Sequence, residues 1–86
     1  MTTTLQQPLR HWVELAIKQY FENLDGLPAE NMYELVLSEV HIGLLRAVMQ
    51  EAHGNQTKAA EYLGIARGTL RKLLLTHGID THAHTE

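Results

Sequence analysis

Basic side chains gather in one short stretch of this 86-residue sequence, where they could bind an anion. Residues 54–79 contain four Lys and Arg residues and one Glu, which gives this stretch a net charge of +3. Arg67 and Arg71 are four residues apart, so a helix would place them on one face. Gly68 and Thr69 lie between them, and a helix start with such small side chains can approach DNA closely and suits phosphate. The other two basic residues are Lys58 and Lys72.

The residues around this basic stretch predict two short helices joined by a tight turn. Asn55 is placed to cap a helix over 56–63, and Gly64 ends that helix. A second helix follows over about 67–76, before a stop signal at residues 77–78. A short Gly-containing turn between two short helices is typical of a helix-turn-helix unit, which points to DNA binding.

Small and apolar residues are expected to pack these two helices together. Ala60 must be small because the helices cross there, and Ile65 and Leu70 are expected to fill the junction. The residues expected to face the rest of the chain are Ala59, Leu63 and Leu74.

Two longer helices are predicted upstream. Apolar residues recur at helical spacing from Leu9 to about Leu24, and the turn residues 25–28 end this first helix. Its aromatic stripe is expected to be core rather than a ligand site; the stripe consists of Trp12, Tyr20 and Phe21.

The second long helix is expected to run from roughly Ala29 or Asn31 to His53, with Asn31 and Glu34 as a capping pair. Its apolar residues cover more than one face, and an 86-residue chain has too little other protein to bury them. We therefore expect a second copy of the chain to cover this helix in an obligate homodimer. Gly43, in its middle, marks a bend or a close contact between helices. The fold predicted is all-α with four helices.

Composition narrows the function further. Residues 1–53 carry three basic and seven acidic residues, a net charge of −4, so the basic stretch is attached to an acidic body. No apolar run approaches the ~18 residues of a membrane span, and the N-terminus lacks the features of a signal peptide, so we expect a cytoplasmic protein. The termini 1–7 and 80–86 are expected to be flexible.

Residues for catalysis or for cofactor and small-molecule binding are not apparent. The sequence has no cysteine, Ser38 is its only serine, and no Gly-rich phosphate loop precedes a helix. Of the six histidines, His11 and His41 are expected on the surface. His77, His82 and His84 resemble an adventitious metal-binding tail rather than a functional metal site.

Three segments together resemble the bacterial Fis family (factor for inversion stimulation). These are YELVLSEV at 33–40, GNQTKAA at 54–60 and LGIARGTLRK at 63–72, and the similarity runs from about Pro8 to Asp80. The last two segments are also found in the related C-terminal domains of NtrC-type activators, whereas the first favours Fis itself. The resemblance implies a single domain over 1–86, with dimerisation helices over 8–53 and the DNA-binding unit over 54–79.

The resemblance also implies a mode of action. A Fis-like dimer is an intertwined, nucleoid-associated transcription regulator that bends double-stranded DNA and reads largely its shape. The helix over 67–76 would enter the major groove, with Arg67 contacting guanine. Residues that match phosphate-contacting or positioning residues are Asn55, Thr57, Thr69, Arg71 and Lys72, and Lys58 completes the predicted site.

This sequence departs from the family pattern at several positions. Ala66 replaces an asparagine that contacts DNA and would cap the recognition helix, and Gly43 replaces a kinking proline. A lysine-rich stretch is replaced at Leu73, Leu75 and Thr76, which predicts weaker binding to flanking DNA. Only seven residues precede Pro8, so activation of a recombinase through an N-terminal arm is not expected.

Two further interpretations stay open. Arg46 is expected in solvent, although it could meet the DNA backbone or RNA polymerase. The main alternative function is an NtrC-type C-terminal module for dimerisation and protein interaction that binds DNA weakly.

Overall fold

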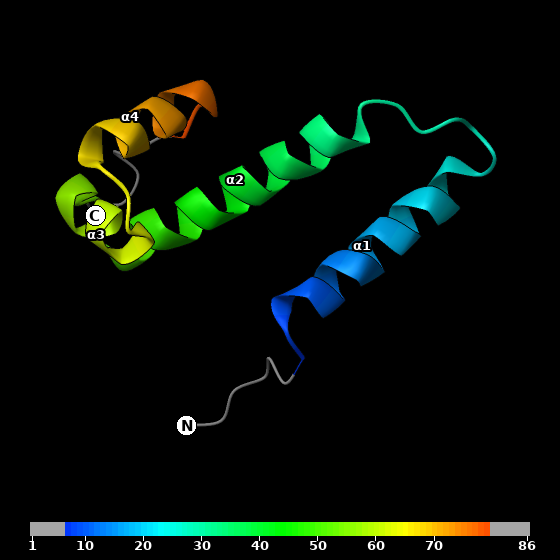
Figure 1. Ribbon diagram of the computed structural model, residues 1–86, viewed down its shortest axis with the longest axis horizontal. Coiled ribbons are helices and arrows are strands. Elements are labelled where there is room, and N and C mark those ends of the chain that lie inside the picture. Colours follow the sequence, from blue (N-terminus) through cyan, green and yellow to red (C-terminus); the bar gives the residue numbers. More distant parts are fainter. Residues whose placement is uncertain (1–6, 80–86) are drawn as a thin grey trace. The chain divides into compact units, whose positions relative to one another are not determined.

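Four α-helices make up the part of the chain that the computed structural model describes, residues 7–79. They are α1 (Leu9–Leu24), α2 (Met32–Glu51), α3 (Gln56–Leu63) and α4 (Arg67–Thr76) (Figure 1). No strand occurs within residues 7–79, which confirms the expected all-α class. Of the ends predicted to be flexible, 1–7 and 80–86, residues 1–6 and 80–86 lie outside the described residues.

The chain forms two compact units, of which the first ends at residue 32 and the second begins at residue 33. None of the helices between residues 7 and 79 is both long and apolar enough to cross a membrane.

Helix α1 is the regular element of the first unit, and its predicted bounds are confirmed. The residue before it, Pro8, has an extended backbone, and the residue after it, Asp25, has a left-handed backbone with a φ of 52°. No residue of α1 is buried: Trp12 is 40% exposed and Phe21 is 51% exposed. The aromatic stripe that was expected to be core is therefore not core within a single chain.

The start of α2 differs from the prediction. The helix begins at Met32, and Asn31 has a φ of 56° instead of the extended conformation of an N-cap. The backbone of Asn31 therefore lacks the usual N-cap geometry on which the predicted pair with Glu34 depends. Asparagine adopts the left-handed conformation more readily than most residues, which explains why it suits this position.

The end of α2 also differs in detail from the sequence-based expectation. The helix ends at Glu51, and the left-handed conformation begins at His53, with a φ of 55°, one residue before Gly54. The His53 N–H donates to the Gln50 carbonyl at 3.1 Å, and the Gly54 N–H donates to the Met49 carbonyl at 3.0 Å. This pair of hydrogen bonds is a Schellman motif, which satisfies carbonyls that the helix itself leaves without donors.

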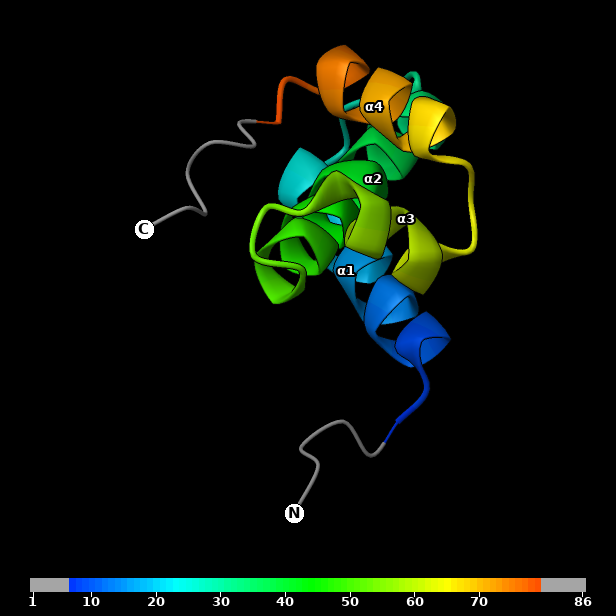
Figure 2. The same cartoon turned by 90° about the vertical axis from the view of Figure 1, so that its left-hand side faces the viewer.

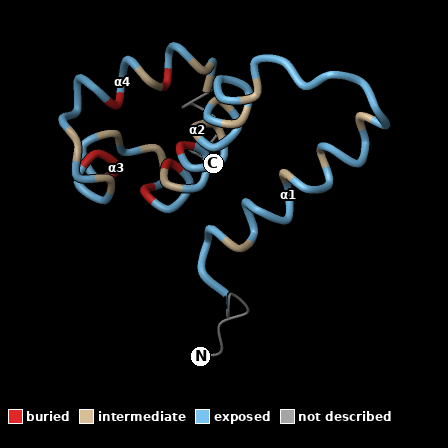
Figure 3. The backbone as a smooth tube through the Cα atoms, turned by 45° about the vertical axis from the view of Figure 1, so that its right-hand side comes forward, coloured by how far each residue is buried: buried red, intermediate tan, exposed pale blue. Residues whose placement is uncertain are grey.

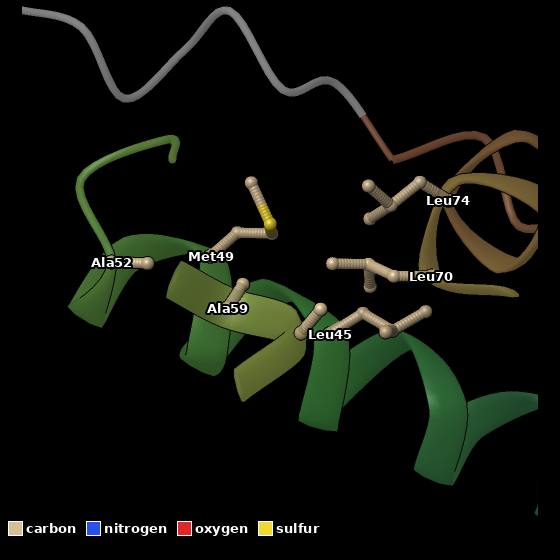
Figure 4. Packing of buried hydrophobic residues seen from close by; sticks show 7 residues of the cluster. Leu45, Met49, Ala52, Ala59, Leu70 and Leu74 are labelled. Carbon is tan, nitrogen blue, oxygen red and sulfur yellow. The ribbon is translucent and has the colours of Figure 1, made fainter. Parts of the chain in front are cut away.

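A small apolar core joins α2, α3 and α4 within the second unit. Figure 3 marks its buried residues on these three helices, and Figure 4 shows their side chains converging. The fully buried side chains of Leu45, Met49 and Leu70 contribute the largest volumes. The remaining buried members are Ala52, Ala59, Ala60 and Leu74, and the residues packed at the margin are Val48, Leu63, Ile65, Leu73 and Ile79.

The turn between α3 and α4 also follows the prediction (Figure 2). Ala60 is buried, as expected for a residue where two helices cross. Gly64 has a φ of 73°, a conformation that side chains with a Cβ resist. The Gly64 N–H donates to the Glu61 carbonyl at 3.2 Å, and the Ile65 N–H donates to the Ala60 carbonyl at 3.1 Å. These two bonds form a second Schellman motif, which reverses the chain.

Replacement of Leu70 by alanine should destabilise the second unit by about 2–5 kcal/mol, because it leaves a cavity in this core. Denaturant unfolding at a fixed protein concentration would measure the loss. The matched control is Leu75→Ala in the same helix, where the side chain is 75% exposed and the change should be small. Equal effects of the two substitutions would contradict this assignment of the core.

Candidate nucleic-acid interface

All seven residues predicted to bind DNA are exposed and belong to α3, α4 or their caps. Three of them lie at the start of α3 and four lie in the first six residues of α4. The α3 group is Asn55, Thr57 and Lys58, and the α4 group is Arg67, Thr69, Arg71 and Lys72.

Asn55 caps α3 as predicted. Its backbone is extended, with φ −83° and ψ 106°, and its Oδ1 accepts a hydrogen bond from the Lys58 N–H at 3.0 Å. This bond engages the side-chain oxygen and leaves the Nδ2 group as a donor for an incoming oxygen. The positive end of the α3 dipole lies at the same place, next to the exposed Thr57 and Lys58 side chains. The start of α3 therefore suits an anion such as a phosphate.

The start of α4 lacks a side-chain cap. Ala66 has the extended backbone of an N-cap, with φ −69° and ψ 147°, but its methyl group makes no cap hydrogen bond. The first helical hydrogen bond runs from the Leu70 N–H to the Ala66 carbonyl at 3.0 Å. The N–H groups of residues 67–69 consequently come before the internal hydrogen bonds of α4, and an outside acceptor can approach them.

Gly68, in the first turn of α4, has space around it. A Cβ added there would meet nothing within 4 Å, so packing inside the described chain does not require a glycine. Arg67 and Thr69 flank it and both are exposed. The first turn of α4 therefore presents a bare stretch of backbone between an arginine and a hydroxyl, which suits close approach by a nucleic acid.

The last four residues of α4, 73–76, carry no charge. Leu75 is exposed and Leu73 packs at the margin of the core, so neither contributes a cation. Thr76 is exposed and uncharged. The positive charge of α4 is thus confined to its first six residues, at Arg67, Arg71 and Lys72.

Two short helices joined by a three-residue turn, with exposed basic side chains on the second, define a helix-turn-helix protein. The family description "Bacterial regulatory protein, Fis family" matches residues 37–74, and "DNA-binding protein Fis N-terminal domain" matches residues 1–29. The DNA-binding protein Fis of Proteus mirabilis (strain HI4320) is 52% identical over 75 residues, which cover 87% of this chain and 76% of the relative. The chain belongs to the Fis family.

Other relatives agree with this assignment. DNA-binding protein Fis of Actinobacillus succinogenes is 55% identical over 73 residues, which cover 85% of this chain and 74% of the relative. DNA-binding protein Fis of Escherichia coli O1:K1 / APEC is 52% identical over 75 residues, with 87% and 76% covered. The resemblance identified from three sequence segments is therefore confirmed.

The two helix starts should respond oppositely to cap substitutions. Asn55→Ala removes the only side-chain cap bond found at the start of α3 and should destabilise the fold by about 1 kcal/mol. Ala66→Ser supplies a hydroxyl at a position that already has N-cap geometry and should stabilise the fold by about 1 kcal/mol. Thermal unfolding of both variants checks the signs, and a stabilised Asn55→Ala variant would contradict the cap.

Proposed function

We propose that this protein is a homodimer that binds and bends double-stranded DNA as a nucleoid-associated transcription regulator. The observation that carries the proposal is the exposure of seven cationic or polar side chains around the starts of α3 and α4 in a Fis-family chain. The relatives named above are DNA-binding proteins, and the helix-turn-helix unit provides the element that enters a major groove.

In this proposal α4 is the recognition helix. Arg67, at its first position, donates to the O6 and N7 acceptors of guanine, the commonest specific arginine contact with DNA. Arg71 lies one turn further on the same face, and Lys72 follows it. These two and Thr69 contact phosphates, while Asn55, Thr57 and Lys58 hold a neighbouring phosphate at the start of α3.

The second copy of the chain is the partner that covers the apolar residues of α1 and α2. A single chain leaves many of them exposed, and no residue of α1 is buried. Large apolar side chains that gather on exposed helix faces commonly mark an interaction surface. The exposed large apolar side chains of the two helices are Leu9, Trp12, Val13, Leu15, Phe21, Tyr33, Leu35, Leu37, Val40 and Leu44.

DNA bending follows from the dimer in this proposal. The Fis-like arrangement holds two recognition helices closer together than successive major grooves of straight DNA, so the duplex must bend to reach both. Sequence preference then depends largely on the deformability of the DNA between the half-sites. Because the last four residues of α4 carry no cation, less flanking DNA is held than in relatives with a lysine-rich stretch there.

The remaining partners and the compartment follow from the same role. The protein acts on the bacterial nucleoid in the cytoplasm and needs no cofactor or catalytic residue to do so. Arg46 is exposed on α2, where it can meet the DNA backbone or RNA polymerase. A regulator that works by binding and bending is not an enzyme.

Replacement of Arg67 by alanine should weaken binding to an A-tract duplex with G and C half-site bases by about 1–3 kcal/mol and relax base preference at the half-sites. Lys72→Ala should weaken binding to all DNA sequences about equally and, because each of the two copies loses one phosphate contact, lower the salt slope by about 0.9 per copy. Gel-shift titrations at two salt concentrations separate the two effects. Absence of a salt-sensitive complex between wild-type protein and DNA at micromolar dimer would refute the proposal.

A second candidate function is an interaction module of the NtrC C-terminal type with weak DNA binding. The absence of charge from the last four residues of α4, with an exposed Leu75, is the observation that favours it. This alternative expects dimers whose affinity for the half-site duplex equals that for random duplex. The same titrations, repeated with random duplex as competitor, decide between the two functions.

The dimer itself can be tested by sedimentation. Leu44→Glu places a charge on the exposed apolar surface of α2 and should convert dimers to monomers at micromolar concentration. Leu75→Glu, which changes an exposed leucine of α4, is the matched control and should leave a dimer. A wild-type chain that sediments as a monomer would contradict the proposed assembly.

A further inference from the structure

Two histidines that are distant in the sequence meet in the second unit, away from the starts of α3 and α4. His41 belongs to α2 and His77 is the C-cap residue of α4, and their ring centroids are 4.9 Å apart with an interplanar angle of 49°. Both residues are half-buried, although His41 was expected on the surface. The DNA-binding role proposed above uses neither imidazole.

The backbone holds both rings in place. His41 lies one helical turn before the buried Leu45, so the packing of α2 on the core fixes its position. The His77 N–H donates to the Leu73 carbonyl at 3.0 Å. Two residues later, the Ile79 N–H donates to the Leu74 carbonyl at 2.9 Å, and both Leu74 and Ile79 pack in or against the core. His41 within α2 and His77 at the C-cap of α4 therefore both stand on backbone that is tied to the core.

The spacing of the ring centroids is compatible with two histidines on one metal ion. A bond of about 2.0–2.1 Å from zinc to nitrogen places the centroid of a ligand ring about 3.2 Å from the metal. Two such rings have centroids about 4.5 Å apart at a bond angle of 90° and about 5.2 Å apart at the tetrahedral angle. The observed 4.9 Å lies between these values. The 49° between the ring planes is compatible with both angles, because each ring can rotate about its bond to the metal.

We propose that His41 and His77 form a two-imidazole site for a divalent transition metal ion such as Zn²⁺, Cu²⁺ or Ni²⁺. Imidazole suits all three ions, and water completes the coordination. No group of three or more His, Cys, Asp or Glu residues suited to a metal occurs within residues 7–79, so the site is open and exchangeable, unlike a closed structural zinc site. A bound ion links α2 to the end of α4.

Such an ion stabilises the folded protein because only the folded chain brings the two rings together. The effect does not require DNA, so the site can be tested apart from the proposed DNA-binding function. His82 and His84, which follow in the sequence but lie outside the described residues, are the competing source of metal affinity. The experiment must therefore separate the pair from these two histidines.

Thermal unfolding of the full chain with and without Zn²⁺ or Ni²⁺ makes this separation. The wild type and the His82→Ala/His84→Ala variant should both gain several degrees in Tm on adding metal. His41→Ala and His77→Ala should each lose this gain, whereas His11→Ala, which changes a half-buried histidine of α1, should keep it. Each variant is compared with its own metal-free Tm, so a change in basal stability does not affect the conclusion.

Electron paramagnetic resonance of the Cu²⁺ complex provides a second measurement. The His82→Ala/His84→Ala variant should show two coordinated imidazole nitrogens, and a further His41→Ala change should leave one. Adventitious binding by the tail predicts the opposite pattern, in which the metal effect survives His41→Ala and disappears with the tail histidines. That pattern, or no metal effect on the folded wild-type protein at micromolar excess of ion, would overturn the proposal.

Discussion

The close approach of α3 to the other helices of the second unit is the constraint on which its architecture depends. Ala59 and Ala60 are both buried there, and their small side chains leave room for the larger core residues. Figure 4 shows Ala59 in the same cluster as Leu45, Met49, Leu70 and Leu74. A larger side chain at either alanine would force the helices apart, because cores packed at native density have no space to absorb it. The packing of α4 in this core thus depends on two small residues of α3.

Buried residues are concentrated in one part of the chain, so the part that would bind DNA differs from the part that would form the dimer. The buried residues on α2 all lie at its C-terminal end, next to α3 and α4, and none is found on α1. The basic residues of the candidate interface likewise belong to the small unit that this core supports. The rest of the chain, α1 and the N-terminal part of α2, leaves its apolar side chains exposed. The proposed second copy covers these side chains and does not involve α4.

The sequence predicted those features that local chemistry controls. The bounds of α1, α3 and α4 follow from turn residues and caps such as Gly64 and Asn55, which act within a few residues of themselves. The left-handed conformations at Asn31 and His53 were not predicted, because these residue types adopt a positive φ only occasionally. Glycine adopts a positive φ without steric cost and is therefore a clearer signal.

Features that depend on distant parts of the chain were predicted less well. Helical spacing identified the aromatic stripe of α1 but could not say which surface would cover it. The contact of His41 with His77 joins residues 36 positions apart, and no local pattern encodes it. The exposure of the seven candidate DNA-binding residues agrees with their predicted role, while their contacts with DNA remain a prediction.

The three Schellman-type helix ends in the second unit have a consequence for the order of folding. Hydrogen bonds that close α2, α3 and α4 span five residues or fewer, as in Gly54 to Met49, Ile65 to Ala60 and Ile79 to Leu74. Chain reversals built from such near neighbours form at low entropic cost. The recognition unit can therefore assemble in a unimolecular step, ahead of the slower bimolecular encounter that the proposed dimer needs. Dilution of the protein would then separate the proposed dimer before it disturbs the fold of the candidate DNA-binding unit.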